Sequence, residues 1–439
     1  MRDLTIKNFR CYENKSIEFR SGINLLIGDN SVGKTSLLRA CNFAVNAFFS
    51  GYSDENTSWN SADNNDFRNT GIAEQPVEII LHLGEWDYST ISTPMGESYS
   101  IDMNTDLKIE KKSKKNSRNL VSGLIPLRDY ASKLKMCSHI ISEDKSIQQI
   151  NPLPVYGCFT TEDIHTVRKI NKDKFKTYMH KPSFGYYECY DCRGLFECWI
   201  KRLLVLKDAK KGEDEINSVR NAVIEALGSG GCNIINDVDI RQNEGKVYFH
   251  FVDGRESESS LLSDGYRRLV NIVMDIAFRC ALLNKTMYGE QSYKYTHGTV
   301  IIDEIDEHLH PELQVRILNA LHKTFPKIQF IISTHAPLVM SSVENTPENV
   351  VYKLEYNNGV YSHKIIDTYG FDVSTIMDVY MGHMSRDIKI ARKIKEIFNL
   401  IDSEDYKVAR VKLNELQLSL PIGDPELSRA DAILSFMEE

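Results

Sequence analysis

The chain has 439 residues, of which 42% are hydrophobic and 26% are charged, and its formal net charge is −8. This length exceeds the ~250–300 residues at which a single core stops growing, so we expect more than one structural unit. The acidic balance excludes a protein that is drawn to nucleic acid by its overall charge, and any such contact needs a local basic patch.

The composition also bears on location. No apolar run approaches the ~18–20 residues that span a bilayer, and residues 1–10 are typical of a strand rather than of a signal peptide. The nine cysteines are odd in number and scattered, which favours reduced thiols over a disulfide framework. We therefore expect a cytoplasmic protein.

A complete phosphate-binding loop follows the first apolar strands. Two short antiparallel strands are predicted on either side of residues 11–14, and the apolar run 22–27 predicts the strand before the loop. The two glycines of Gly-Asp-Asn-Ser-Val-Gly-Lys-Thr let successive N–H groups converge on phosphate oxygens at the start of the helix predicted for 36–44. The lysine then reaches the β- and γ-phosphates and the threonine ligates Mg²⁺, which indicates a nucleoside triphosphate as the ligand. The predicted nucleotide contacts are Gly28, Asp29, Asn30, Ser31, Val32, Gly33, Lys34, Thr35 and Ser36.

The next part of the chain is long and polar. Residues 50–71 are predicted to be a loop, and a strand returns at 77–83. Residues 84–150 are weakly patterned and contain the most basic run of the chain, Lys108–Arg118. This run has two interpretations: it contacts nucleic-acid phosphates, or it is a solvated loop, which is the commoner role of an isolated charge run.

The middle of the chain holds two further clusters with alternative interpretations. A strand at 154–159 and helices over 195–227 surround a cysteine cluster with one Cys-x-x-Cys pair, which fits a zinc site or, because the second pair is missing, buried thiols. Before the strand at 247–251, Asp237–Asp239 has the form of a nuclease carboxylate pair, but a junction between a turn and a strand is favoured. The cysteine cluster comprises Cys189, Cys192 and Cys198, with His180 upstream.

Two apolar strands near residue 300 end in polar side chains. The strand 299–302 ends in Asp303 and Glu304, which fits a Walker B site. Asp303 holds Mg²⁺, directly or through water, and Glu304 orients and deprotonates the attacking water. The strand 330–332 ends in Ser-Thr-His, where His335 can hydrogen-bond the γ-phosphate region.

The segments before and after the first of these strands are less specific. Ser263 and Gly265 precede an amphipathic helix, where a helix N-terminus presents N–H groups and a hydroxyl to an anion, although Ser-Asp-Gly is also a common cap and turn. A metal site formed by Asp306, His308 and His310 is conceivable, but a loop that leads into a helix is favoured.

In this order and spacing, the motifs resemble those of the ABC-type, SMC-like ATPases of the OLD and AAA15/AAA21 group, over residues 1–83 and 231–350. The resemblance implies an α/β fold, an ABC-type P-loop ATPase head with a mixed central sheet, helices on both faces and a small antiparallel layer. It also implies that two heads dimerise around ATP and Mg²⁺. The motifs that carry it are Asn8-Phe9-Arg10, Gly28–Thr35, Leu262–Gly265, Asp303-Glu304, Asp306, His310-Pro311 and Ser333–His335.

The resemblance gives the residues around one nucleotide their roles. Lys34 and Thr35 bind phosphate and Mg²⁺, and Asp303 with Glu304 forms the Walker B site, in which Thr35 and Asp303 are the metal ligands. His335 is the switch histidine. The implied catalytic residues are Glu304, His335 and Lys34.

The resemblance also assigns residues that act across the dimer. Ser263 and Gly265 belong to the signature motif, which reaches the nucleotide of the partner copy, and Asp306 is the D-loop residue. Two positions depart from the family pattern. Ser31 stands where glycine is frequent, which the backbone should tolerate, and the Q-loop glutamine has only Gln75 as a candidate.

We expect the chain to be organised in four segments. Residues 1–83 form the first part of the ATPase head, and 84–230 form an inserted α/β segment that is loop-rich and then helical. Residues 231–370 form the second part of the head, and 371–439 form a helical C-terminal region suited to docking a partner. The chain has no long heptad arm and no room for a Toprim nuclease domain after the switch histidine.

The C-terminal sequence Gly423–Leu427 on a compact head is similar to that of the PtuA ATPases of Septu and retron-associated anti-phage systems, a family that pairs with an HNH nuclease, PtuB. This resemblance implies an ATP-binding and hydrolysing subunit of a bacterial anti-phage defence complex, in which nucleotide-dependent assembly regulates the nuclease. Two alternatives stay open. One is an OLD/SMC-like ATPase, stimulated by nucleic acid through Lys108–Arg118 and acting without a nuclease partner, and the other is a scaffold that binds ATP without turning it over.

Overall fold

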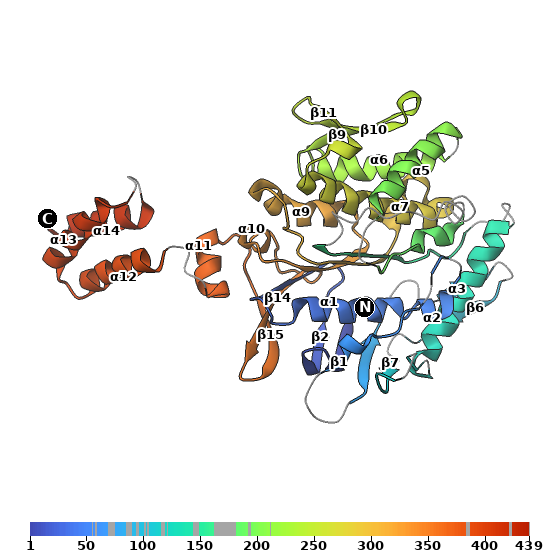
Figure 1. The fold of residues 1–439 in the computed structure, drawn as a ribbon, viewed down its shortest axis with the longest axis horizontal. Helices are drawn as coiled ribbons and strands as arrows, with labels where there is room; N and C mark the ends of the chain where they lie inside the picture. Colours follow the sequence, from blue (N-terminus) through green and yellow to red (C-terminus); the bar gives the residue numbers. More distant parts are fainter. Residues whose placement is uncertain are drawn as a thin grey trace. The chain divides into compact units, whose positions relative to one another are not determined.

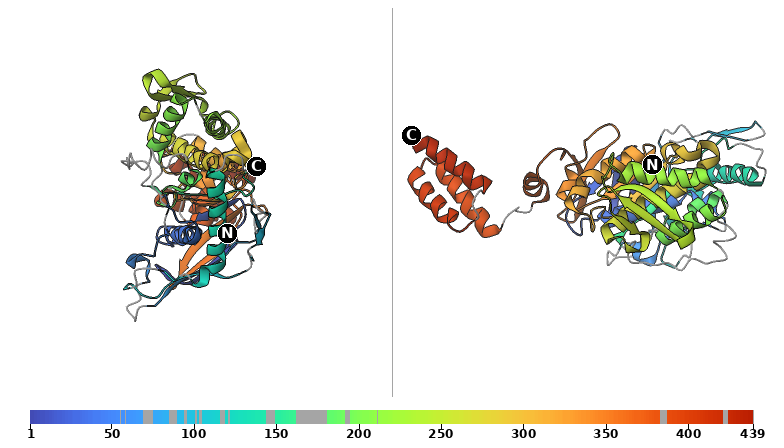
Figure 2. Two further views of the ribbon diagram at one scale, coloured as in Figure 1. Left: turned by 90° about the vertical axis from the view of Figure 1, so that its right-hand side faces the viewer. Right: turned by 90° about the horizontal axis from the view of Figure 1, so that it is seen from above.

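The computed structural model divides the chain into two compact units, Met1–Gly370 and Phe371–Glu439 (Figures 1 and 2). Within the described residues, no helix is long and apolar enough to cross a membrane. The structure describes all residues except 55, 58, 69–74, 85–89, 94–95, 101, 103–104, 116–118, 121, 144–148, 162–180, 192–194, 211, 383–386, 421–423 and 439.

A mixed six-stranded sheet forms the centre of the first unit, in the order β15-β14-β3-β13-β12-β8. Neighbouring strands pair in parallel except for β14 and β15, which are antiparallel. The parallel strands β3, β8, β12 and β13 are buried along their whole length, which is typical of strands covered on both faces. Because these strands are parallel, their carboxyl ends meet at one edge of the sheet. The strands are β3 (Ile23–Ile27), β8 (Val155–Phe159), β12 (Gly298–Ile302), β13 (Ile328–Ser333), β14 (Val350–Asn357) and β15 (Val360–Ile366).

One face of the central sheet is covered by helix α1 (Lys34–Asn46), which also contacts a second sheet. This second sheet is antiparallel, in the order β2-β1-β4-β7, and α1 lies between the two sheets (Figure 1). The small antiparallel layer that the sequence predicts is therefore present. Its strands are β1 (Asp3–Phe9), β2 (Tyr12–Glu18), β4 (Val77–His82) and β7 (Leu107–Lys111).

Four longer helices lie on the opposite side of the central sheet (Figures 1 and 2). They are α5 (Phe196–Asp208), α6 (Glu213–Leu227), α7 (Asp264–Tyr288) and α9 (Pro311–Thr324). A three-stranded sheet of β9 (Ile235–Arg241), β10 (Lys246–Phe251) and β11 (Glu256–Glu258) packs on α5 and α6. Helices on both faces of a mixed sheet confirm the predicted fold class.

The segment between β4 and β8 is more regular than its sequence indicates. Helix α3 (Ile125–Glu143) was not predicted, although its buried residues Leu127, Tyr130, Ala131 and Leu134 have helical spacing. Polar sequence on both sides hides this short apolar series. The smaller elements of the first unit are α2 (Phe49–Tyr52), β5 (Thr90–Ser92), β6 (Ser98–Ser100), α8 (Ser292–Tyr295) and α10 (Pro337–Met340).

The basic run starts inside a strand rather than in a solvated loop. In β7, Lys108 pairs with Glu78 at 2.7 Å and with Glu110 at 3.0 Å. Lys111 is buried, and its ammonium donates to the carbonyl of Ala62. Lys108 and Lys111 are thus already bound to protein groups, because strand β7 brings them into contact with the rest of the sheet. Contact of this run with nucleic acid would depend on these two cations among others.

The second unit has a small core of its own. Three helices, α12 (Ile388–Asp402), α13 (Tyr406–Gln417) and α14 (Pro425–Glu438), follow the short helix α11 (Val373–Thr375). Each of the three buries one apolar face against the others. The core residues are Ile394, Ile397, Ile401, Ala409, Leu413, Leu416, Leu427, Ala430 and Leu434.

Candidate functional site

The phosphate-binding loop connects the buried strand β3 to helix α1. Gly28 and Gly33 have φ angles of 143° and 96°, a conformation that side chains rarely adopt. A Cβ atom on Gly28 would lie 2.5 Å from the carbonyl oxygen of Leu354, and one on Gly33 would lie 2.5 Å from the Tyr12 hydroxyl. That hydroxyl donates a hydrogen bond of 3.0 Å to the carbonyl of Gly33. The glycines therefore allow neighbouring strands to support the loop at close range.

Ser31 occupies a position where the backbone is left-handed, with φ 69°. This explains the glycine expected there, because a residue with a Cβ atom loses about 1–2 kcal/mol in this conformation. Ser31 is exposed, so its side chain meets no steric obstacle. The loop tolerates this departure, as the sequence predicts, at a small cost in backbone strain.

The ammonium group of Lys34 lies over the loop. It donates to the carbonyl oxygens of Gly28 at 2.7 Å and of Asp29 at 2.9 Å. Burial lowers the pKa of Lys34 to about 8, although the carboxylates of Asp303 and Glu304 act in the opposite direction. A polyanion at this position would restore a stable positive charge on the lysine.

A hydroxyl at the end of the neighbouring strand β13 contacts both acidic residues that follow β12. Ser333 Oγ donates to Asp303 and accepts a hydrogen bond of 2.8 Å from the backbone N–H of Glu304. The backbone of Glu304 is left-handed, with φ 51°. Burial raises the pKa of Glu304, and the nearby Asp303, Asp306 and Glu307 raise it further. Glu304 is thus fixed in a strained position with a carboxylate that accepts protons more readily than usual.

The D-loop and the switch segment are joined by a similar contact. Asp306 accepts hydrogen bonds from the hydroxyl of Thr334 and, at 3.3 Å, from the backbone N–H of His335. Burial and the nearby Lys34 lower the pKa of His335, so its imidazole is neutral at pH 7. His335 therefore lies near the other site residues and acts as a neutral hydrogen-bonding group.

A cavity of about 800 Å³ is lined by Thr35 and Asp303, the two predicted metal ligands. Hydroxyl and carboxylate oxygens are hard donors that suit Mg²⁺, which keeps its remaining ligands from phosphates and water. Thr160 and Thr161, which follow β8, line the same cavity. Gln75, the candidate for the Q-loop glutamine, is exposed and precedes β4 of the antiparallel sheet. Strand β8, which pairs with β12, is followed by the two threonines and not by a glutamine.

The signature residues begin helix α7. Ser263 is the N-cap, its side chain makes no capping hydrogen bond, and it is exposed. Gly265 packs so closely on the loop after β12 that a Cβ atom would lie 2.3 Å from the carbonyl oxygen of His308. Neither Ser263 nor Gly265 lines the cavity beside Thr35.

One buried arginine joins the signature helix to the Walker B carboxylates. Arg268, which is 1% exposed, donates to the backbone carbonyls of Asp303 at 2.8 Å and Glu304 at 2.9 Å. It also forms an ion pair with Glu307. Arg268 therefore links the start of α7 to the loop after β12 in the same chain.

The sequence singled out neither Arg268 nor Ser333 for these contacts, and it gave no role to Asp66. Asp66 is fully buried and binds Arg10 at 2.9 Å and Arg39 at 2.6 Å. Both arginines line the cavity. Two sequence features could have drawn attention to these residues: Arg268 is the second arginine after the signature motif, and Asp66 lies in an Asn-Asp-Phe-Arg stretch of a predicted loop. Neither feature identifies the distant residue with which the side chain pairs.

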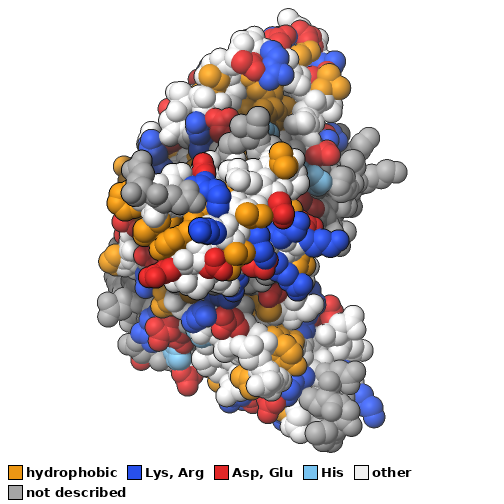
Figure 3. All heavy atoms as spheres, turned by 90° about the vertical axis from the view of Figure 1, so that its left-hand side faces the viewer, with side chains coloured by type: hydrophobic (Ala, Val, Ile, Leu, Met, Phe, Trp, Pro, Cys, Tyr) orange, Lys and Arg blue, Asp and Glu red, His pale blue; other side chains and the backbone are white. Residues whose placement is uncertain are grey.

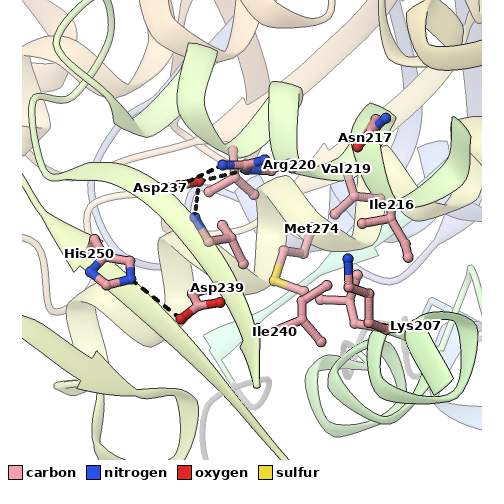
Figure 4. Close-up of a pocket in the computed structure, with 13 residues that line it drawn as sticks. Lys207, Ile216, Asn217, Val219, Arg220, Asp237, Asp239, Ile240, His250 and Met274 are labelled. Atoms are coloured by element: carbon pink, nitrogen blue, oxygen red, sulfur yellow. Dashed lines mark hydrogen bonds and ion pairs between the residues drawn. The ribbon is translucent and has the colours of Figure 1, made fainter. Parts of the chain in front are cut away.

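The two carboxylates of Asp237–Asp239 lie in strand β9, at a second cavity of about 220 Å³ (Figure 4). Arg220 binds Asp237 through two contacts of 2.6 Å, and Arg241 binds Asp239 at 2.8 Å. His250 lies 3.9 Å from Asp239. Because each carboxylate has its own guanidinium, the arrangement does not form the metal-binding pair of a nuclease.

The other metal hypotheses find no support in the described part of the chain, where no cluster of three or more His, Cys, Asp or Glu residues is arranged to hold a metal. Cys189 and Cys198 are buried, and burial raises the pKa of both thiols to about 12. Cys192 and His180 lie outside the described residues. Seven described cysteines are free, but Cys158 is disulfide-bonded. The expectation of reduced thiols is therefore wrong for Cys158. Scattered spacing in the sequence cannot reveal a pair of cysteines that the fold brings together.

The phosphate-binding loop, the two acidic residues after β12 and His335 lie at one edge of a mixed sheet, which is the arrangement of a P-loop ATPase head. A family model for an AAA domain, AAA_23, matches residues 3–419, and the chain belongs to this family. The match to this family, together with curated relatives from retron and Septu systems, confirms the resemblance to SMC-like and anti-phage ATPases.

Curated relatives include the Retron Vc95 probable ATPase of Vibrio cholerae, 28% identical over 287 residues, which are 62% of this chain and 50% of the relative. The Septu protein PtuA of Bacillus mycoides is 31% identical over 166 residues, 37% of this chain and 21% of PtuA. The Retron Ec83 probable ATPase of Escherichia coli is 24% identical over 406 residues, 78% of this chain and 70% of the relative. The matches thus span half or less of the first two relatives.

Among solved structures, the chain is similar to the SMC head domain from Thermotoga maritima, with 15% identity, a TM-score of 0.37, and coverage of 83% of this chain and 98% of that one. It is also similar to an Smc head bound to the C-terminal winged-helix domain of ScpA, with 14% identity, a TM-score of 0.43, and coverage of 83% and 98%.

Proposed function

We propose that the chain is the ATP-binding and hydrolysing subunit of a bacterial anti-phage defence complex, in which nucleotide-dependent assembly regulates a partner nuclease of the HNH type. The names of the retron and Septu relatives support the biological setting. The chemistry rests on the contact of Ser333 with the carboxylate of Asp303 and with the backbone N–H of Glu304, which supports both residues at the end of β12.

In this proposal each site residue has a defined task. Thr35 and Asp303 hold Mg²⁺, which neutralises charge on the phosphates when it is bound. Lys34 leaves the loop carbonyls and pairs with the β- and γ-phosphates. Glu304 orients a water and accepts its proton as the water oxygen bonds to the γ-phosphorus and the bond to the ADP oxygen breaks. Neutral His335 hydrogen-bonds the γ-phosphate region.

The second half of the site comes from another copy of the chain. Ser263 is exposed and occupies the N-cap position of a long helix without a capping hydrogen bond, an arrangement that suits an anion held by another molecule. Leu261, two residues earlier, is 74% exposed, which fits a surface that a second copy covers. We therefore propose an ATP-sandwiched homodimer, the assembly that the sequence resemblance implies.

Arg268 couples the two sites of this dimer. Within one chain it binds the carbonyls of Asp303 and Glu304, which serve that chain's own nucleotide. It belongs to the helix that presents Ser263 to the partner's nucleotide. When Ser263 binds the partner's nucleotide, Arg268 thus transmits this closure to Glu304 at the nucleotide site of its own chain. The contact of Arg268 with Glu304 can in this way report the nucleotide state to a bound nuclease.

The test is to co-express the chain with the product of the neighbouring gene and to measure co-purification and nuclease activity with ATP, ADP or no nucleotide. The proposal predicts an HNH-type subunit in the complex and nuclease activity that changes with the nucleotide. A Lys34→Met variant, which lacks the ammonium group that pairs with the phosphates and should bind ATP more weakly, should lose this nucleotide response. Absence of an HNH-type subunit together with nucleotide-independent activity would overturn the regulatory part of the proposal.

A scaffold that binds ATP without hydrolysis makes a different prediction. Phosphate release by the wild type and by Glu304→Gln would then be equal, whereas hydrolysis requires the variant to be much slower. The alternative of stimulation by nucleic acid through residues 108–118 is weakened by the engagement of Lys108 and Lys111 in the sheet.

A further inference from the structure

We propose that the C-terminal unit carries a nucleic-acid contact surface on helix α12. The surface, called here the α12 stripe, consists of Lys389, Arg392, Lys393 and Lys395. All four side chains are exposed. Residues three and four apart are neighbours on a helix, so Lys389, Arg392 and Lys393 form one continuous patch, and Lys395 lies beside it. This inference does not depend on the proposed ATPase function.

Three other cations of the same unit are engaged by neighbouring side chains. Arg410 forms an ion pair with Asp431, and Lys412 forms one with Glu396. Arg429 lies over the ring of Phe398, 5.8 Å from its centre. Within the part of the unit that the structure describes, no ion pair or hydrogen bond engages the side chains of the α12 stripe. Their charge is therefore available to an external anion.

Helix stability does not account for these charges. Lys389 lies in the first turn of α12, where the helix dipole favours negative side chains and disfavours a positive one by about 0.3–1 kcal/mol. Asp387, the N-cap, already satisfies this preference by accepting hydrogen bonds from the N–H groups of Lys389 and Ile390. The opposite face of α12 supplies the core through Ile394 and Ile397. The stripe thus belongs neither to the core of the unit nor to its described ion pairs.

The chemistry of the stripe fits phosphates better than it fits an acidic protein. Stable protein interfaces have an apolar centre, but on the exposed face of α12 only Ile388 is a large exposed apolar residue. Three of the four cations are lysines, which act as point charges and suit contact with a phosphate backbone without base readout. In the space-filling view, Lys and Arg side chains lie among Asp and Glu side chains (Figure 3), so the positive charge of the stripe is local and not a property of the whole surface.

The experiment uses the full chain and a fluorescein-labelled 30-nucleotide single-stranded DNA, with a duplex of the same sequence in parallel. Binding is measured by anisotropy between 50 and 200 mM NaCl. In the variant Lys389→Glu, Arg392→Glu, Lys393→Glu, we expect affinity to fall at least roughly 10-fold, and the salt slope to decrease by about 2 for three lost contacts on a single strand. The matched control reverses three exposed cations of the other basic run, Lys112, Lys114 and Lys115, and should change affinity less than about twofold.

A glutamine version of the α12 variant guards against misfolding, since it removes the charge and keeps helix propensity; it should show an intermediate loss with an unchanged far-UV circular dichroism spectrum. Three results would overturn the proposal. The first is that the wild type binds neither DNA at 50 mM NaCl. The second is that the two charge-reversal variants lose affinity equally, and the third is that the α12 variant binds like the wild type. Binding of polyglutamate but not of DNA, abolished by the α12 variant, would assign the surface to an acidic protein instead.

Discussion

Arg268 should be needed for hydrolysis rather than for nucleotide binding. In Arg268→Met the carbonyls of Asp303 and Glu304 lose the guanidinium that now donates to them at 2.8 and 2.9 Å. Hydrogen bonds to charged groups contribute about 1.5–3 kcal/mol each, and partial rehydration reduces the loss, so we expect the free energy of unfolding to fall by about 3 kcal/mol. Glu307 is 28% exposed and can turn to water, so its lost ion pair adds little.

The effect on catalysis follows from the strain at Glu304. Its left-handed backbone is held by Ser333 on one side and by Arg268 on the other. Without Arg268 the carboxylate moves from its position beside the γ-phosphate, and a displacement of about 1 Å costs roughly 100-fold in rate. The KM for ATP should stay within about twofold, because the phosphate-binding loop is unchanged.

The assay is steady-state phosphate release at a temperature where circular dichroism shows the variant to be folded. The matched control is Arg267→Met, which removes the adjacent arginine and its contact of 2.9 Å with Glu197 at the surface. The control should retain most of the wild-type kcat. A folded Arg268→Met with wild-type kcat, or an equal loss in the two variants, would refute the reasoning.

Three further predictions concern single groups of the site. Gly265→Ala places a Cβ atom 2.3 Å from the carbonyl oxygen of His308 and should abolish hydrolysis, whereas Gly230→Ala, whose nearest contact is 3.6 Å away, should be neutral; phosphate release compares them. The pKa of Lys34 is about 8 in the free protein, so its charge and the affinity for ATP should fall as pH rises above 8, and calorimetric titration of Lys34→Met should show no such dependence. The raised pKa of Glu304 means that the active carboxylate is lost as pH falls, so the acidic limb of kcat/KM should lie above the usual range of a glutamate; a limb at ordinary glutamate pH would contradict this assignment.

The site motifs could be predicted because each is local in sequence. Gly28 and Gly33 flank a short turn, and Asp303 and Glu304 directly follow a buried strand, so backbone geometry alone fixes their surroundings. The parallel sheet then brings the strand ends together. The fold class was predictable for the same reason, since long apolar strands alternate with amphipathic helices.

The contacts that hold the site together could not be predicted because they join distant residues. Ser333 reaches Asp303 across 30 positions, and Arg268 reaches Glu304 across 36. Their residue types are common, so nothing in the local sequence identifies the partner. The strand position of Lys108 was missed for a related reason, since its salt bridge with Glu78 reaches across to the neighbouring strand β4.

Ser263 of one copy is proposed to complete the nucleotide site of another. Mixing two inactive variants, Ser263→Arg and Glu304→Gln, and measuring phosphate release tests this directly. A mixed dimer contains one site with an intact Glu304 and an intact Ser263 from different chains, so an equal mixture should recover up to about a quarter of wild-type activity. If Ser263 instead served the nucleotide of its own chain, no pairing would restore a site. A mixture no more active than the separate variants would contradict the account.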